Sequence, residues 1–366
     1  MAPTLSGGFR AAFWIIGGIG AIWAIAFSAF TTPFIQKHAL YAHKLHTGYF
    51  QDLSKPQRWG FAKNQVTPFN FSTPDSETLY AWHIMPLGLY AQHDAEMRAQ
   101  PSGIAEDITK TKAFRLLTED PNARLIISFH GNAGSVAQGW RPDIYRSLSD
   151  GSTSSIHILA PDYRGFGYST GSPSEAGLIT DGIATVNWAL DVAKIPAERI
   201  VIIGHSLGTA VTAATVEHFA KEGVNFAGVI VIAPFSDLPT LLTRYAPGGL
   251  IPLLHPIEWF KGIHERFPRW IHDKWPSASR LANFVSISER VRLFIIHARD
   301  DHEIPCTHSD TIFAAVANAT TPGMDVKTFD AMKKRQTVDL GEGASISTWK
   351  TDKKLIQEII VSYGGE

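Results

Sequence analysis

Gly204-His205-Ser206-Leu207-Gly208 is the stretch of sequence that decides the fold. It follows the apolar run 199–204 and opens a helical pattern that continues to Lys221. A Gly-x-Ser-x-Gly turn between a buried strand and a helix is typical of a nucleophile elbow, which holds the serine hydroxyl above the sheet. The flanking glycines permit the strained turn without a side-chain clash. We therefore predict that Ser206 is a catalytic nucleophile.

The same pattern occurs a second time, at Gly167-Tyr168-Ser169-Thr170-Gly171. Here no strand precedes the motif, and Pro173 follows it. Five letters recur easily by chance in a chain of this length, so the context decides between the two copies. We interpret Ser169 as part of a structural loop.

Around Ser206, short apolar runs alternate with helical patterns. Each run is five or six residues long and apolar nearly throughout, which is typical of strands buried on both faces of a parallel sheet. The alternation predicts helices on both sides of that sheet. Strands are expected at 124–129, 156–160, 199–204, 228–233 and 291–296, after two extended segments at 66–72 and 79–85; helices are expected at 135–148, 174–192 and 207–221.

The composition excludes several classes of protein. Lysine and arginine number 33 against 34 aspartates and glutamates, so charge gives no case for binding nucleic acid. Cys306 is the only cysteine, which rules out an internal disulfide and a cysteine-rich zinc site. We expect neither a metal nor a cofactor.

Residues 11–30 form an uncharged, apolar run that stops before Pro33. Twenty helical residues span roughly 30 Å, the thickness of a bilayer core. A signal peptide usually has a shorter apolar region and a clearer basic start, and a buried helix that is apolar on all faces is unusual at an N-terminus. We therefore predict an uncleaved single-pass membrane anchor.

Hydrolysis of an ester builds negative charge on the carbonyl oxygen, and that charge needs N–H donors already in place. The backbone N–H of Leu207 would supply one donor. The segment 129–134, Phe-His-Gly-Asn-Ala-Gly, follows a predicted strand and would supply the second, at Asn132. The alternative is that His-Gly-Asn is only a tight turn. His130 precedes the nucleophile, so we interpret it as structural.

The catalytic acid should follow the nucleophile, at the carboxyl end of a later strand. The segment 297–305, His-Ala-Arg-Asp-Asp-His-Glu-Ile-Pro, is the convincing place, because a buried strand precedes it and it ends in a proline. Asp300 and Asp301 compete for the role.

Three stretches together carry a family resemblance: 130–134, Asp162-Tyr-Arg-Gly-Phe-Gly-Tyr-Ser169, and the elbow itself. They resemble serine hydrolases of the α/β-hydrolase superfamily, and within it the membrane-anchored monoacylglycerol and lysophospholipid lipase branch. The segment after the strand in that branch looks like His-Gly-x-x-Asp-x-x-Val-Pro, which implies that Asp301 is the acid.

The resemblance implies an α/β-hydrolase fold with a mostly parallel sheet, helices on both faces and a helical cap, after one transmembrane helix. The implied substrate is an acyl-ester lipid, and the bilayer is the other partner. The divisions we expect are a tail at 1–10, the anchor at 11–32, a juxtamembrane linker at 33–65 and the hydrolase domain at 66–366, with a polar insertion at about 92–122 and a cap at about 235–290.

The catalytic base departs from the pattern, because only His302 and His308 follow Asp301. His302 adjoins the acid and His308 opens a helical pattern, so neither fits. Two segments, 325–329 and 355–363, could be the final strand that delivers the histidine. The second runs into Gly364-Gly365, so the base is expected just after Gly365 and the 366-residue chain would stop one step short of it. The alternative makes 353–363 a closing amphipathic helix.

Two readings of the cap remain open. Its aromatic residues lie among lysines and arginines, which suits a membrane interface, but the same rings could pack the cap onto the core. They are Trp259, Phe260, Phe267, Trp270 and Trp275.

The sequence thus predicts a membrane-anchored serine hydrolase that cleaves carboxylic esters of monoacylglycerol or lysophospholipid-like lipids. Amide or thioester cleavage is the alternative within the enzyme class, and a non-catalytic binding protein is the alternative outside it. Sequons at Asn70 and Asn318 suit a luminal domain and hence the endoplasmic reticulum or another endomembrane.

Overall fold

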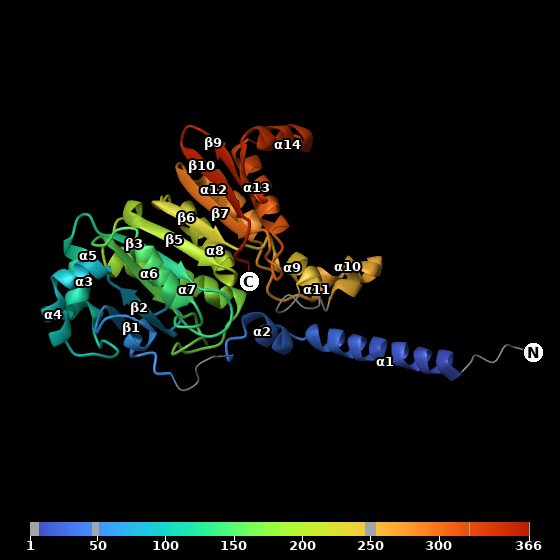
Figure 1. Ribbon diagram of the computed structural model, residues 1–366, viewed down its shortest axis with the longest axis horizontal. Helices are drawn as coiled ribbons and strands as arrows, with labels where there is room; N and C mark the ends of the chain where they lie inside the picture. The colour runs from blue at the N-terminus through green and yellow to red at the C-terminus, as the bar shows by residue number, and fades with distance from the viewer. Residues whose placement is uncertain (1–6, 46–50, 246–253, 322, 366) are drawn as a thin grey trace, which may run out of the picture.

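A ten-stranded sheet forms the centre of the computed structural model, which describes residues 7–45, 51–245, 254–321 and 323–365 (Figure 1). The strand order is β1-β2-β4-β3-β5-β6-β7-β10-β9-β8. Strands β4, β3, β5, β6, β7 and β10 run parallel, while β1 and β2 at one edge and β9 and β8 at the other pair antiparallel. The α/β fold and the mostly parallel sheet predicted from the sequence are confirmed.

All strands except β8 and β9 lie where extended or apolar runs predicted them, and the long helix after the elbow is also confirmed. The strands are β1 (Val66–Ser72), β2 (Thr78–Ile84), β3 (Arg124–Phe129), β4 (Ile156–Pro161), β5 (Ile200–His205), β6 (Gly228–Ile232), β7 (Val291–Ala298), β8 (Thr337–Gly341), β9 (Ala344–Lys350) and β10 (Lys354–Val361).

Helices of eight residues or more are α1 (Gly7–Phe30), α2 (Pro33–Tyr41), α5 (Lys112–Glu119), α6 (Arg141–Ser149), α7 (Glu175–Asn187), α8 (Leu207–Lys221), α12 (Ser277–Ile287), α13 (Thr307–Thr320) and α14 (Val326–Arg335). Shorter helices of the polar insertion and cap are α3 (Leu87–Gln92), α4 (Asp94–Ala99), α9 (Leu238–Arg244), α10 (Lys261–His264) and α11 (Phe267–Trp270).

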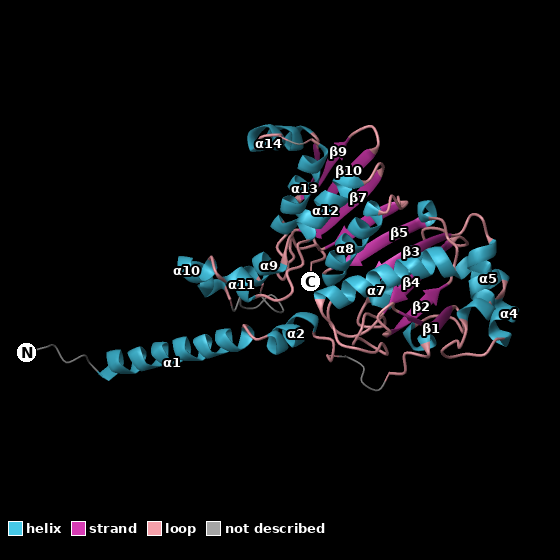
Figure 2. Cartoon of the chain, turned by 180° about the vertical axis from the view of Figure 1, so that it is seen from behind, coloured by secondary structure: helices cyan, strands magenta, loops and turns pink. Residues whose placement is uncertain are grey.

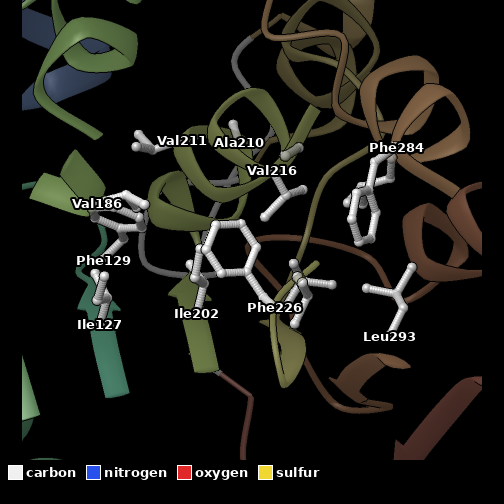
Figure 3. Packing of buried hydrophobic residues seen from close by; sticks show 14 of the residues in the cluster. Ile127, Phe129, Val186, Ile202, Ala210, Val211, Val216, Phe226, Phe284 and Leu293 are labelled. Carbon is white, nitrogen blue, oxygen red and sulfur yellow. The ribbon is translucent and has the colours of Figure 1, made fainter. Parts of the chain in front are cut away.

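Both faces of the sheet are buried, because successive side chains of a strand point to opposite sides. Ile127 of β3 packs into the larger core cluster with α7, α8 and α12, whereas its neighbour Ile126 packs into a second cluster with Tyr145 of α6. Figure 2 shows α7 and α8 lying across the first face, and Figure 3 shows Val186 and Val216 from these helices among the side chains of β3, β5 and β7. This packing fixes the elbow between β5 and α8.

Two expectations near the end of the chain need correction, and one hairpin there was not expected. The segment 325–329 is not a strand but the start of α14, because the carboxylate of Asp325 caps the N–H of Thr328. The alternative closing helix at 353–363 is wrong, since these residues form β10, parallel to β7. The β8–β9 hairpin was not predicted at all.

The helix expected at 135–148 is shorter than predicted and begins at Arg141. Gly134 and Gly139 both adopt positive φ, which a helix interior does not allow, and Pro142 marks the first turn. The residues before it instead form the loop that faces Ser206.

The segment 33–65, expected to be a linker, contains the helix α2 and is attached to the body of the domain. The side-chain amide of Gln36 donates to the carbonyl of Trp270 (2.6 Å) and accepts from the N–H of His272 (2.9 Å). The hydroxyl of Tyr41 donates to Asp273. These bonds tie α2 to the cap.

One helix among the described residues, Gly8–Phe30, is long and apolar enough to cross a bilayer. Most of its side chains are exposed, including Ile15, Ile16 and Ile22. It projects from the body on the same side as the cap helices α9, α10 and α11 (Figure 1). This arrangement is compatible with a single-pass membrane anchor.

Candidate active site

Ser206 lies in the strained turn between β5 and α8. Its backbone has φ 51° and ψ −118°, a conformation that non-glycine residues rarely adopt and that costs about 1–3 kcal/mol. Its N–H donates to the carbonyl of Ile232 on β6, which holds the turn against the sheet. The side chain is 7% exposed. The protein therefore maintains a costly backbone conformation at the residue that the motif singled out.

The two glycines of the elbow are required for close packing rather than for unusual backbone angles. A Cβ atom on Gly204 would lie 2.3 Å from the carbonyl oxygen of Gly208, and one on Gly208 would lie 2.1 Å from the carbonyl oxygen of Phe129. The first turn of α8 thus rests directly on the end of β3. The positive φ belongs to Ser206 itself, which corrects our interpretation of what the glycines do.

The loop after β3, residues 130–134, is called the oxyanion loop for the role predicted from the sequence, and it reaches Ser206. A Cβ atom on Gly131 would lie 3.3 Å from the Cβ of Ser206. Arg141 holds this loop from the other side, donating to the carbonyls of Gly131 (3.1 Å) and Asn132 (2.7 Å). In a trans peptide the C=O and the next N–H point in opposite directions, so the N–H of Asn132 points away from Arg141.

The same loop is hydrogen-bonded to the segment that follows the membrane helix. The N–H of Ala133 donates to the carbonyl of Tyr41 (2.9 Å), and the N–H of Gly134 donates to the carbonyl of Leu45 (2.9 Å). The loop is therefore held between Arg141 on one side and the end of α2 on the other, in the preorganised state that stabilisation of an oxyanion requires.

Asp301 is buried directly after β7. One carboxylate oxygen accepts from the N–H groups of Glu303 (3.0 Å) and Ile304 (2.7 Å), and the other lies 3.4 Å from Nε2 of His297. His297 is occupied elsewhere, since its nitrogens bond the hydroxyl of Ser309 and the carbonyl of Ile304. Asp301 is thus oriented by backbone donors, as expected of a residue that positions a base.

Neither histidine downstream of Asp301 lines the cavity that contains Ser206. His302 is exposed, next to the buried acid. His308 is buried, and its Nδ1 lies 3.0 Å from the hydroxyl of Ser236. Burial lowers the pKa of His308 to about 4, so its ring is neutral and engaged in the core at ordinary pH.

Two further residues singled out by the sequence are structural. His130 is buried against Asp162, with 3.3 Å between Nε2 and Oδ1. The hydroxyl of Ser169 accepts from the N–H of Tyr80 and donates to the carbonyl of Asp162. Both contact Asp162 at the start of the loop after β4, and His130 also bonds the carbonyl of Gly131 in the loop after β3 (2.7 Å).

Gly365 lies against the acid. A Cβ atom at this position would lie 2.4 Å from the Cα of Asp301, so that only glycine fits without a shift. Its N–H donates to the carboxylate of Asp300 (2.9 Å). This bond holds the residues after β10 beside the loop that contains Asp301. Glu366, where the base was expected, lies outside the described residues.

A cavity of about 330 Å³ opens at Ser206 and Asn132. Its lining is mostly apolar and comes from α1 and α2, the loop after β3, the elbow, the cap and the loop that contains Asp301. The apolar residues include Trp23, Phe27, Phe30, Leu238, Leu241 and Ile271. A pocket of this size and character suits a ligand that is largely hydrocarbon with one polar group near the serine.

The cap aromatics divide between the two interpretations. Phe267 and Trp275 are fully buried, which supports packing for these two rings. Trp259 and Phe260 are 73% and 53% exposed, and Trp270 is 36% exposed. Only the second group can meet a membrane surface.

A model of the alpha/beta hydrolase family matches residues 126–332, from β3 to α14. The chain belongs to this family. The α/β-hydrolase fold predicted from Ser206 and its neighbours is thereby confirmed.

Relatives of the family match most of the chain. The lysophosphatidylserine lipase ABHD12 of Gallus gallus is 27% identical over 310 residues, which cover 81% of this chain and 70% of the relative. The same lipase of Danio rerio is 28% identical over 306 residues, covering 81% and 69%. The human protein ABHD12B is 30% identical over 203 residues, covering 53% and 50%.

An α/β-hydrolase from Vibrio vulnificus resembles the whole fold, with a TM-score of 0.54 at 15% identity over 79% of this chain and 83% of that one. At this identity the likeness concerns the fold alone.

Sequence reasoning missed the contribution of residues far from the motifs. Arg141, Gln36 and Tyr41 position the oxyanion loop and the cap, and no local pattern pointed to them. A partial signal was available for α2, because Pro33 is a good first residue of a helix as well as the end of the preceding one. The cavity residues of α1 carried only the signal of a membrane anchor.

The contact between α8 and β3 can be tested with Gly208→Ala. The new methyl group would meet backbone oxygens that cannot move aside, so we expect α8 to shift from the oxyanion loop, with a loss of about 1–3 kcal/mol of stability and of serine reactivity. Urea unfolding and labelling by a fluorophosphonate would measure both. The control is Gly228→Ala in β6, where the nearest atom would be 3.8 Å away. Equal behaviour of the two variants would contradict the packing argument.

Proposed function

We propose that this protein is a membrane-anchored carboxylic-ester hydrolase that cleaves the acyl ester of lysophospholipid-like lipids, monoacylglycerols among them, through an acyl-enzyme on Ser206. The observation that carries the proposal is a serine held at φ 51° beside the oxyanion loop, in the lining of a mostly apolar cavity. A binding protein that does not react would have no use for this backbone strain. The lipase names of the relatives support the same substrate class.

In this mechanism the hydroxyl oxygen of Ser206 attacks the ester carbonyl carbon while a general base takes its proton. The N–H groups of Leu207 and Asn132 stabilise the resulting oxyanion. The bond to the alcohol oxygen then breaks, and the base returns the proton to that oxygen. Water attacks the acyl carbon in the same way, which releases a fatty acid and restores Ser206. Asp301 orients the base.

We propose that the base enters the site directly after Gly365. The support for this proposal is that Gly365, the last described residue, packs on the backbone of Asp301 and bonds the carboxylate of Asp300. His272 is the alternative within the described residues, because it lines the same cavity as Ser206. It precedes the acid in the chain, however, and the family order places the base after it.

For localisation we propose an endomembrane, such as the endoplasmic reticulum, with the hydrolase domain on the luminal side. Asn70 lies exposed on β1, an edge strand of the sheet, and Asn318 lies exposed on α13. Both sequons are therefore accessible to a glycosyltransferase.

The nucleophile is tested by Ser206→Ala, in any form of the chain that hydrolyses a short-chain p-nitrophenyl ester. We expect kcat to fall by about four to six orders of magnitude, because only binding and the oxyanion donors remain. Fluorophosphonate labelling should disappear as well. Ser169→Ala is the matched control and should keep its labelling, since its hydroxyl bonds the backbone of the β4 loop. Loss of labelling in Ser169→Ala alone would refute the assignment.

The place of the base is tested by Glu366→His followed by a short polar tail. A positioned histidine should raise kcat/KM for the short ester by about 10²–10⁴ over the 366-residue chain, the range typical of general base catalysis. Glu366→Gln with the same tail is the control and should give no gain. Full activity of the 366-residue chain that is lost in His272→Ala would assign the base to His272 instead.

The luminal orientation is tested by glycosylation. When the full chain is inserted into endoplasmic reticulum membranes, we expect an N-glycan on Asn70 that shifts its mobility on a gel and is removed by an endoglycosidase. Asn70→Gln should abolish that part of the shift, and Asn318→Gln serves as the comparison. A chain that inserts without any glycan would place the domain on the cytosolic side.

A further inference from the structure

The membrane helix is part of the cavity that contains Ser206. Trp23, Ala26, Phe27 and Phe30 of α1 all line it. Their spacing is i, i+3, i+4 and i+7, so they form a single face of the helix. Neighbouring residues of the helix, such as Ile22 and Ile25, are 70% and 71% exposed and do not line the cavity. One face of the anchor is therefore turned toward the catalytic site, and the rest is left for lipid.

This face of α1 is packed against the cap. The ring of Phe27 stacks on that of Trp23 at 5.4 Å between centroids and meets the edge of Trp270 at 5.8 Å. Phe27 also lies 6.2 Å from Phe267, which is fully buried in the cap. The two contacts of Phe27 with cap rings fix the side of the helix that faces the body.

The next helix, α2, fixes the position of the end of α1 relative to Ser206. Gln36 bonds the backbone of the cap on both sides of Ile271, and Tyr41 bonds Asp273 with its side chain and the oxyanion loop with its carbonyl. Only Thr31 and Thr32 separate α1 from α2. The last turns of the anchor therefore have a defined position beside Ser206.

The chemistry of the lining identifies the occupant as an acyl chain. Apolar residues of α1 and α9 line the cavity together with Ser206 and Asn132, the residues expected to react with an ester carbonyl. A lipid whose tail lies beside α1 in the bilayer could slide along this helix into the cavity. Each methylene that avoids water on this path avoids the cost of hydrating apolar surface.

We infer that the C-terminal turns of the membrane helix are one wall of the acyl-chain site, so that the substrate's tail passes from the bilayer to Ser206 along the face formed by Trp23, Ala26, Phe27 and Phe30. The inference rests on the proposed function for its substrate class. It gives α1 a role in binding and specificity in addition to anchoring.

The decisive variant is Ala26→Trp, which places a large ring inside the cavity. Ala24→Trp is the matched control, because it makes the same change two residues away, at a position that does not line the cavity. The full chain of each variant is placed in phosphatidylcholine vesicles with a lysophospholipid whose acyl chain carries a diazirine at its methyl end. Irradiation should label Leu238, Leu241 or Leu242 of α9, which lie inside the cavity away from bulk lipid.

We expect Ala26→Trp to reduce labelling of α9 by about tenfold or more and Ala24→Trp to leave it unchanged, in line with the effect of filling an apolar pocket. Equal labelling in the two variants, or labelling confined to the lipid-facing side of α1, would overturn the inference. Membrane insertion of both variants is checked by resistance to alkaline extraction. Phe27→Ala, which enlarges the cavity, serves as a second variant and should increase labelling by a bulkier chain.

A kinetic version separates this inference from the proposed function. In a form of the chain that hydrolyses a short ester, hydrolysis of p-nitrophenyl acetate is the reference for each variant. The ratio of long-chain lysophospholipid hydrolysis to acetate hydrolysis should fall in Ala26→Trp, mainly through KM for the long-chain substrate, and should stay at the value of the unchanged chain in Ala24→Trp. If no ester is hydrolysed and a small fluorophosphonate does not label Ser206, the proposed function fails, while the cross-linking result still decides the role of α1. If both esters are hydrolysed and chain-length dependence does not change, the inference alone fails.

Discussion

The structure depends on the close approach of α8 to β3. Because Gly208 has no side chain, the first turn of the helix rests on the carbonyl of Phe129, and Ser206 is forced into the left-handed region at the point of contact. The same contact brings the loop after β3 within reach of the serine. Burial of both faces of the parallel sheet offsets the backbone strain at Ser206. The geometry of the catalytic site therefore depends on the packing of the core.

Much of the fold could be predicted because the central strands are buried on both faces and are therefore apolar in every position. The hairpin of β8 and β9 escaped prediction because β8 is almost fully exposed, with Val338 and Leu340 each 59% accessible. A signal for it was present in Gly341-Glu342-Gly343, three consecutive residues with positive φ that turn the hairpin. Asp325, three residues before Thr328, was likewise a capping signal for α14 that an apolar reading of 325–329 overlooked.

The site was predictable where a residue's role follows from its place on a strand end. The elbow and the acid loop were found in this way, because parallel strands carry their reactive residues at the carboxyl ends. Arg141 and Gln36 were not, because a side chain that binds backbone groups leaves no motif, and the partners of Gln36 are also more than 230 residues away in sequence. The general base is a different case, since its expected position falls at Glu366, beyond the described residues.

The hydrogen bonds of α2 change where the cooperative folding unit begins. Tyr41 and Leu45 complete the backbone pairing of the oxyanion loop, and Gln36 completes that of the cap. A soluble version that starts at Val66 would remove the partners of these donors and acceptors, at a cost of the order of 1–3 kcal/mol for each group that stays buried without one. On these contacts the folded body extends back to Pro33. A protease that cuts between α2 and β1 would therefore detach a helix that belongs to the folded unit, together with the anchor.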